Sequence, residues 1–248
     1  MVLQFDVDIA AGSGRSINAS FALPDGSENT DAGLPGVLVI HEIFGLTDDI
    51  RRIAARFAEA GYAALAPDLF GSGFRPACVA RVFKALRNRE GQAFDDLDVA
   101  RSWLADRSEV DGERLAAAGF CMGGGFALMY GVKGPIRATA DFYGDVPKDP
   151  SELAGVCPVV GGFGERDRLF ASHGRRLDAV LDDLGVDHDV VIYPGVGHSF
   201  MNQHPDGMLK KVTAVGPMHV GYDDEAAEDS WRRMLSLFGR VLATDGDG

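Results

Sequence analysis

A cysteine flanked by glycines is the residue of this chain with the clearest chemical potential. Cys121 lies in Gly-Phe-Cys-Met-Gly-Gly, between an apolar run ending at Gly119 and a run of small residues that favours a helix. This is the G-x-nucleophile-x-G pattern of a sharp strand-to-helix turn, with cysteine where serine is usual. The free N–H groups of the following helix favour a thiolate and a developing oxyanion. A buried cysteine beside a glycine-rich turn is the alternative interpretation.

Two more residues suit a catalytic triad with this thiol. Asp167 follows the apolar run at 156–161, and His198 follows the run at 190–193. The chain order of nucleophile, acid and histidine is that of an α/β-hydrolase triad, in which the imidazole takes the thiol proton and the carboxylate orients the imidazole. Glu165 competes for the acid role, and we favour Asp167 because it lies deeper in the loop. Each of these residues could instead be an ordinary loop residue.

A histidine and a glutamate follow the first buried run, in His-Glu-Ile-Phe-Gly at residues 41–45. This is not a zinc-binding H-E-x-x-H, because glycine stands where the second histidine should be. The loop after an early strand commonly supplies an oxyanion N–H, so the backbone amides of Ile43 and Met122 are candidates for an oxyanion hole. Glu42 would lie near the thiol and, by like-charge repulsion, hold it protonated. A loop-capping role for Glu42 is the alternative.

The elements that must position these groups alternate between strands and helices. An N-terminal hairpin is expected from residues 5–10 and 17–23, with a turn at Ser13. Short apolar runs then predict buried strands, and amphipathic stretches predict helices between them. The expected strands are 36–40, 62–66, 115–119, 139–142, 156–160 and 190–193, and the expected helices are 48–59, 93–104, 175–184 and 224–242. We therefore expect a doubly wound, mostly parallel α/β sheet with helices on both faces and functional groups at the carboxyl ends of its strands.

Length and composition limit the function. The 248 residues, 46% of them hydrophobic, suit a single domain over 1–248. The net charge of −13 argues against nucleic acid or an anionic membrane as a partner. No apolar run is long enough to span a bilayer and the N-terminus lacks the basic start of a signal peptide, so a cytoplasmic location is expected. We expect no metal and no organic cofactor, a small-molecule substrate, and a monomer or small homo-oligomer.

Taken together, the motifs resemble the dienelactone hydrolase (carboxymethylenebutenolidase) family of α/β-hydrolases, over nearly the whole chain. The matching segments are His-Glu-Ile-Phe-Gly at 41–45, Ala-Pro-Asp-Leu-Phe at 66–70, the cysteine turn at 119–124, Gly-Glu-Arg-Asp at 164–167, Gly-His-Ser-Phe at 197–200 and the tail from 222 to 231. The resemblance implies the α/β-hydrolase fold and a triad of Cys121, His198 and Asp167. It also implies that Glu42 contacts the resting thiol and releases it when substrate arrives.

The chain departs from this family in one place. Members that act on dienelactone carry an arginine just after the His-Ser-Phe segment, where this chain has Met201 and Asn202. A second family arginine follows the Pro-Asp-Leu segment, and Arg75 and Arg81 both lie in that region. We take these two arginines and Phe44 as candidate substrate-binding residues, with a solvated surface role for the arginines as the alternative. The loss of one bidentate contact weakens the case for a substrate that carries a carboxylate.

These observations predict a hydrolase of small lactones or esters that works through a covalent cysteine intermediate. A general carboxylesterase without lactone preference is one alternative. A non-catalytic or redox-sensing thiol protein on the same fold is another, because an exposed thiol of low pKa also suits a peroxide sensor. The sequence shows no evident resolving cysteine, since Cys78 lies in a helical pattern and Cys157 in a buried strand pattern.

Overall fold

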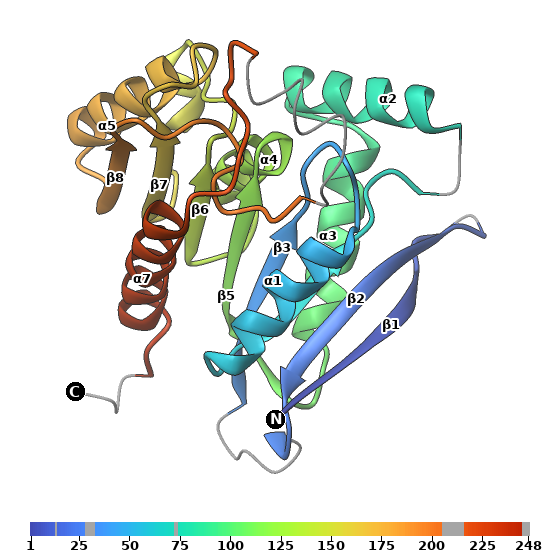
Figure 1. Ribbon diagram of the computed structural model, residues 1–248. Helices are drawn as coiled ribbons and strands as arrows, with labels where there is room; N and C mark the ends of the chain where they lie inside the picture. Colours follow the sequence, from blue (N-terminus) through green and yellow to red (C-terminus); the bar gives the residue numbers. More distant parts are fainter. Residues whose placement is uncertain (13, 28–32, 72–73, 205–215, 245–248) are drawn as a thin grey trace.

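An eight-stranded sheet runs through the computed structural model, which describes residues 1–12, 14–27, 33–71, 74–204 and 216–244 (Figure 1). In spatial order the strands are β1 (Val2–Ala10), β2 (Ser16–Pro24), β4 (Ala63–Pro67), β3 (Leu34–Ile40), β5 (Val110–Phe120), β6 (Ala138–Phe142), β7 (Val159–Gly164) and β8 (His188–Tyr193). The hairpin β1–β2 is antiparallel and joins β4 antiparallel, while the other pairs are parallel. The expected hairpin and parallel sheet are confirmed; the turn residue Ser13 lies outside the described residues.

Helices cover both faces of the sheet, as expected for a doubly wound fold (Figure 1). One face carries α1 (Asp48–Glu59) and α7 (Asp224–Val241); the other carries α2 (Arg75–Asn88), α3 (Gln92–Ala105), α4 (Met122–Lys133) and α5 (Ala171–Leu184), with the short 3-10 helix η2 (Pro150–Leu153). None of the helices within the described ranges has the length and hydrophobicity needed to cross a lipid bilayer.

The central strands are apolar on both faces because each face packs on its own layer of helices. In β3, Leu38 and Ile40 join the core with α3 and α4, while Val37 and Val39 join the core with α1 and α7. All four side chains are fully buried. The continuous apolar run at this place in the sequence therefore reflects burial on two sides.

Several expected strands start too late, most clearly the one expected at 115–119, which is β5 and starts at Val110. Two other expected boundaries are wrong for a local reason. The strand expected at 156–160 is β7, which starts at Val159 because Pro158 has no N–H to donate to the sheet. Cys157 consequently precedes the strand. The helix expected from residue 175 is α5, which starts at Ala171. Its pattern is interrupted by Gly174, where a Cβ atom would lie 2.7 Å from the ring of Phe163. Helix α2 was not among the expected helices, although the sequence shows a helical pattern around Cys78.

The turn between β5 and α4 depends on two close backbone approaches. A Cβ atom on Gly119 would lie 1.9 Å from the carbonyl oxygen of Gly123, and one on Gly123 would lie 2.1 Å from that of Ile40. Real Cβ contacts are not this short, so only glycine fits at either position. The start of α4 is thereby held against the end of β3.

We expect Gly123→Ala to lower the free energy of unfolding by roughly 3 kcal/mol or more, because the added methyl group meets a fixed backbone carbonyl. Gly239→Ala is the matched control, since a Cβ atom at this position of α7 has no neighbour within 4 Å. The control should gain about 0.5–1 kcal/mol from helix propensity. Urea unfolding of the two variants measures both effects, and equal stabilities would contradict the packing described.

Candidate active site

The cysteine of the turn has an unusual backbone conformation. Cys121 has φ 55° and ψ −118°. Residues other than glycine rarely adopt this backbone conformation, which costs about 1–3 kcal/mol. Its N–H donates to the carbonyl of Phe142 at 3.0 Å, and helix α4 begins at the next residue. The half-buried thiol therefore lies at the positive end of the helix dipole, where a thiolate is stabilised.

A histidine and an aspartate from two other loops meet at the same sheet edge. His198 Nδ1 lies 2.6 Å from Asp167 Oδ2, and both side chains are almost completely buried. Glu165, the competing acid, instead accepts the backbone N–H of Gly195 at 3.1 Å. The structure therefore brings Asp167, rather than Glu165, to the imidazole. The other oxygen of Asp167 caps the turn before α5, which fixes the carboxylate.

The imidazole is basic despite its burial. Burial lowers the pKa of His198, but Asp167 on one side and the Cys121 thiol on the other outweigh it and raise the pKa to about 10. The rings of Tyr143 and Phe170 lie against the imidazole, with centroids 5.0 Å and 5.1 Å away. His198 Nε2, the ring nitrogen that does not face Asp167, is buried and has no hydrogen-bond partner among the described residues. The two flanking rings leave the imidazole little freedom to turn.

Glu42 is buried near His198, with 1% of its side chain exposed. Burial raises its pKa to about 8, and the negative charge of Asp49 adds to the rise, while His198 and a hydrogen bond from Ser199 oppose it. In the described structure the carboxyl oxygens lie 3.5 Å from Ser199 Oγ and 3.4 Å from His204 Nδ1. The expected contact of Glu42 with the Cys121 thiol is not among these, and it stays a prediction.

The two candidate oxyanion amides lie on two elements that approach each other closely. Met122 is the first residue of α4, so its N–H has no acceptor within the helix. Ile43 lies in the loop after β3, and its side chain is 37% exposed. The close approach of α4 to the end of β3 places the two segments together. Their role as an oxyanion hole stays a prediction.

His41 fixes the loop that carries Glu42 and Ile43, a role the sequence did not reveal. Its Nε2 accepts the N–H of Leu69 at 3.0 Å, so the ring proton is on Nδ1 and is donated to the carbonyl of Glu42 at 2.7 Å. The side chain is fully buried. This histidine ties the loop after β3 to the loop after β4.

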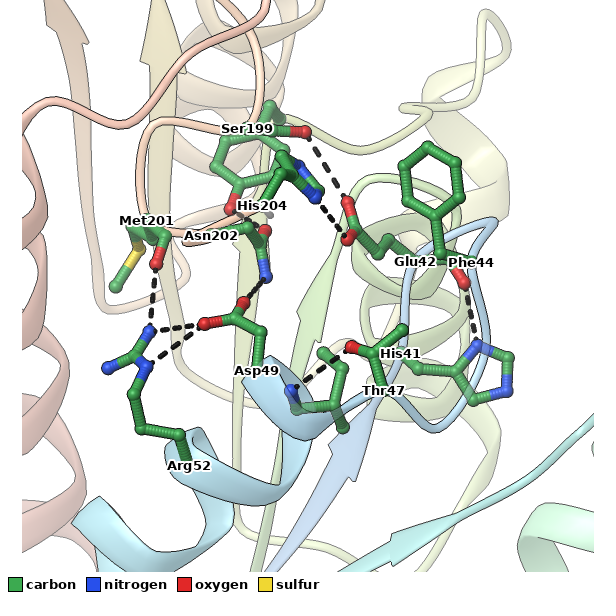
Figure 2. A network of polar contacts seen from close by, with 12 residues as sticks. His41, Glu42, Phe44, Thr47, Asp49, Arg52, Ser199, Met201, Asn202 and His204 are labelled. Carbon is green, nitrogen blue, oxygen red and sulfur yellow. Dashed lines mark hydrogen bonds and ion pairs between the residues drawn. The ribbon is translucent and has the colours of Figure 1, made fainter. Parts of the chain in front are cut away.

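A chain of buried polar contacts was also missed (Figure 2). The Arg52 guanidinium donates to Asp49, whose second oxygen accepts Asn202 Nδ2 at 2.8 Å. Asn202 Oδ1 in turn accepts the Tyr143 hydroxyl at 2.5 Å. The amide of Asn202 is fully buried and both of its ends are used inside the protein. The signal available in the sequence was the position of Tyr143 and Asn202 just beyond strands β6 and β8.

The candidate substrate-binding residues lie around the loops that border the thiol. The exposed Arg75 donates to the carbonyl of Phe44 and lies over the ring of Phe70, 4.7 Å from its centroid. Arg81 donates to the carbonyl of Phe70 at 3.0 Å. Phe44 itself is 40% exposed. Both arginines therefore connect α2 to these loops, and their contact with a substrate stays a prediction. Among the described residues, no group of three or more His, Cys, Asp or Glu side chains is placed to hold a metal ion.

The sequence profile described as "Dienelactone hydrolase family" matches residues 17–242, which include every residue of this site. The chain belongs to this family. It is therefore a hydrolase of the dienelactone hydrolase type on an α/β-hydrolase fold, and the resemblance seen in the motifs is confirmed.

Relatives and solved structures agree with this assignment. A Salmonella typhimurium protein provisionally named a carboxymethylenebutenolidase is 30% identical, over 94% of this chain and 86% of its own length. A dienelactone hydrolase-like promiscuous phosphotriesterase from metagenomic libraries has a TM-score of 0.77 at 25% identity, covering 97% of this chain and 98% of that one. The dienelactone hydrolase of Anabaena variabilis shares the fold, with a TM-score of 0.67 at 19% identity over 98% and 99% of the two chains.

We expect Asp167→Asn to lower the pKa of His198 from about 10 by roughly two units or more, because the carboxylate that opposes burial is removed. Titration of the imidazole signals by NMR measures this change. Glu165→Gln is the matched control and should leave the pKa of His198 unchanged, because Glu165 bonds to Gly195 instead. A larger shift in the control than in Asp167→Asn would contradict the pairing described.

Proposed function

We propose that the protein hydrolyses small carboxylic esters and lactones through a thioester on Cys121, with His198 and Asp167 as the other members of the triad. The observation that carries the proposal is the convergence of three groups at one sheet edge. These are a strained cysteine at the start of a helix, a buried imidazole whose pKa that cysteine raises, and a carboxylate 2.6 Å from that imidazole. A thiol, a base and a group that orients the base are what nucleophilic acyl transfer needs.

The acylation half-reaction uses the proton of the thiol. His198 takes this proton, and the Cys121 thiolate attacks the substrate carbonyl carbon. The electron pair of the carbonyl moves to its oxygen, which the amides of Met122 and Ile43 stabilise. The C–O bond to the leaving group then breaks as the His198 imidazolium gives its proton to the leaving oxygen. An alcohol is released from an ester, while a lactone opens and its hydroxyl end stays on the acyl group.

Hydrolysis of the thioester repeats these steps with water. Neutral His198 takes a proton from the water molecule, which attacks the thioester carbonyl. The second tetrahedral intermediate collapses with release of the Cys121 sulfur, and the product acid leaves. Asp167 stays ionised and holds the imidazolium that forms in each half-reaction.

Two observations bear on the substrate. Asn202, at the place where dienelactone-hydrolysing members carry an arginine, has both ends of its amide bonded to Asp49 and Tyr143. This residue is also fully buried, so its side chain is not exposed to a substrate carboxylate. The exposed side chains at the loop after β3 are the apolar Ile43 and Phe44. Both features favour esters and lactones without a carboxylate.

The redox-sensing alternative lacks a second reactive thiol among the described cysteines. Cys78 is buried in α2 with 3% exposure. Burial raises the pKa of Cys157 to about 12, so this thiol stays protonated at neutral pH. An intramolecular disulfide with Cys121 would need one of these two groups to become accessible and ionised.

We expect Cys121→Ala to lower kcat/KM for a neutral p-nitrophenyl ester and for a dienelactone by roughly 10⁴-fold or more, because the nucleophile is lost. The neutral ester should be the better substrate of the wild type. Cys157→Ser is the matched thiol control and should retain activity. A neutral phosphotriester belongs in the same assay, because a structural relative is described as a promiscuous phosphotriesterase.

Mass spectrometry of acid-quenched reactions gives the second measurement, since an acyl group should appear on the peptide that contains Cys121. Turnover that survives in Cys121→Ala would contradict the nucleophile. Absence of turnover of all three substrates, with Cys121 alkylated rapidly by iodoacetamide, would favour the redox-sensing alternative.

A further inference from the structure

The buried glutamate beside the nucleophile has a basic partner that the proposed reaction does not use. Glu42 Oε1 lies 3.4 Å from Nδ1 of His204, while its other oxygen, Oε2, lies 3.5 Å from Ser199 Oγ (Figure 2). Only 1% of the Glu42 side chain is exposed, against 18% for His204. The imidazole therefore links a buried carboxyl group to the surface of the protein.

The loop after β8 sends its side chains in different directions. His198 faces Asp167, and Asn202 faces Asp49, away from Glu42. His204 lies edge-on to the ring of Phe44, with centroids 5.3 Å apart, on the same loop as Glu42. Two contacts thus hold His204 against the loop after β3, one to a carboxyl group and one to an aromatic ring.

Glu42 lies in surroundings where a cation has a large effect. The groups that contact Glu42 or change its electrostatic surroundings come from three elements. They are Asp49 from α1, Tyr143 after β6, and His198, Ser199 and His204 from the loop after β8. Cys121, at the start of α4, is an electrostatic neighbour of the same Tyr143. Burial and Asp49 disfavour the carboxylate form of Glu42, whereas His198 favours it. A protonated His204 acts in the same direction as His198, because opposite charges a few ångströms apart stabilise each other.

We propose that His204 is a positioning residue, which pairs with Glu42 as imidazolium with carboxylate and thereby sets the protonation state of Glu42 beside the triad. The pair titrates as one coupled unit. With both protons bound, Glu42 is neutral. Opposite charges on the two groups stabilise each other, so their contact favours the form in which His204 is imidazolium and Glu42 is carboxylate. Without His204, Glu42 keeps its proton to a higher pH.

The consequence for catalysis rests on the proposed hydrolase function. Because His198 lowers the pKa of Glu42, an ionised Glu42 equally favours the imidazolium form of His198. Imidazolium is the form that protonates the leaving oxygen. His204 would therefore extend toward lower pH the range in which Glu42 supports this step.

We expect His204→Gln to raise the titration midpoint of Glu42 by about one pH unit or more, because the cation is lost. The measurement is the ¹³C NMR titration of protein labelled at the glutamate carboxyl carbons, with the Glu42 signal assigned by its loss in Glu42→Gln. His204→Lys restores a positive charge and should return the midpoint to the wild-type value or below. His188→Gln is the matched control. His188, at the start of β8, faces Asp178 and Asp182 of α5 rather than Glu42.

An unchanged Glu42 midpoint in His204→Gln would overturn the proposal, and so would an equal shift in His188→Gln. The rate of Cys121 alkylation by iodoacetamide against pH is the second readout. His204→Gln should displace this profile in the wild-type background and leave it unchanged in the Glu42→Gln background. Neither measurement needs turnover, so a failure of the hydrolase proposal is distinguishable from a failure of this one.

Discussion

The site depends on the contact between the start of α4 and the end of β3. Glycine at 123 lets the helix backbone reach the carbonyl of Ile40, and no larger residue fits there. This contact places the first free N–H groups of the helix next to the loop that carries Glu42 and Ile43. Cys121 joins β5 to the same helix, so its backbone is fixed at this junction. The strain at Cys121 is offset by the packing of the two flanking segments, each of which is fixed by the sheet.

Four acidic side chains are buried in this part of the protein, and each has different polar partners. Asp167 faces an imidazole and Asp49 faces a guanidinium and an amide, so each has polar partners that compensate for its burial. Asp141, fully buried beneath the start of α4, accepts the N–H of Gly144, and burial raises its pKa well above the ordinary range. Glu42 is intermediate, because it has polar neighbours but burial still raises its pKa to about 8. A chain with a large negative charge thus distinguishes its buried carboxyl groups by their local partners.

The sequence was sufficient to predict the features that local patterns encode. Glycine spacing marked the turn at Cys121, and loops directly after buried strands marked Asp167 and His198, whose contact the structure shows. The sequence could not predict partners set by loop conformation across long separations, such as Asn202 with Asp49. Tyr143 has a positive φ that propensity does not reveal in a non-glycine residue. Two boundaries were wrong where Pro158 lacks a backbone donor and where Gly174 interrupts a helical pattern to pack on Phe163.

The order of strands in the sheet has a consequence for the chain during its synthesis. Strand β3 pairs with β5, so Val39 meets Ala118 only after a long stretch of intervening chain has been made. Contacts between such distant residues form slowly compared with local ones. The base and the acid come later still, beyond β7 and β8. A nascent chain that already contains Cys121 therefore lacks Asp167 and His198, and the contact between these two residues forms only when the last strands have added to the sheet.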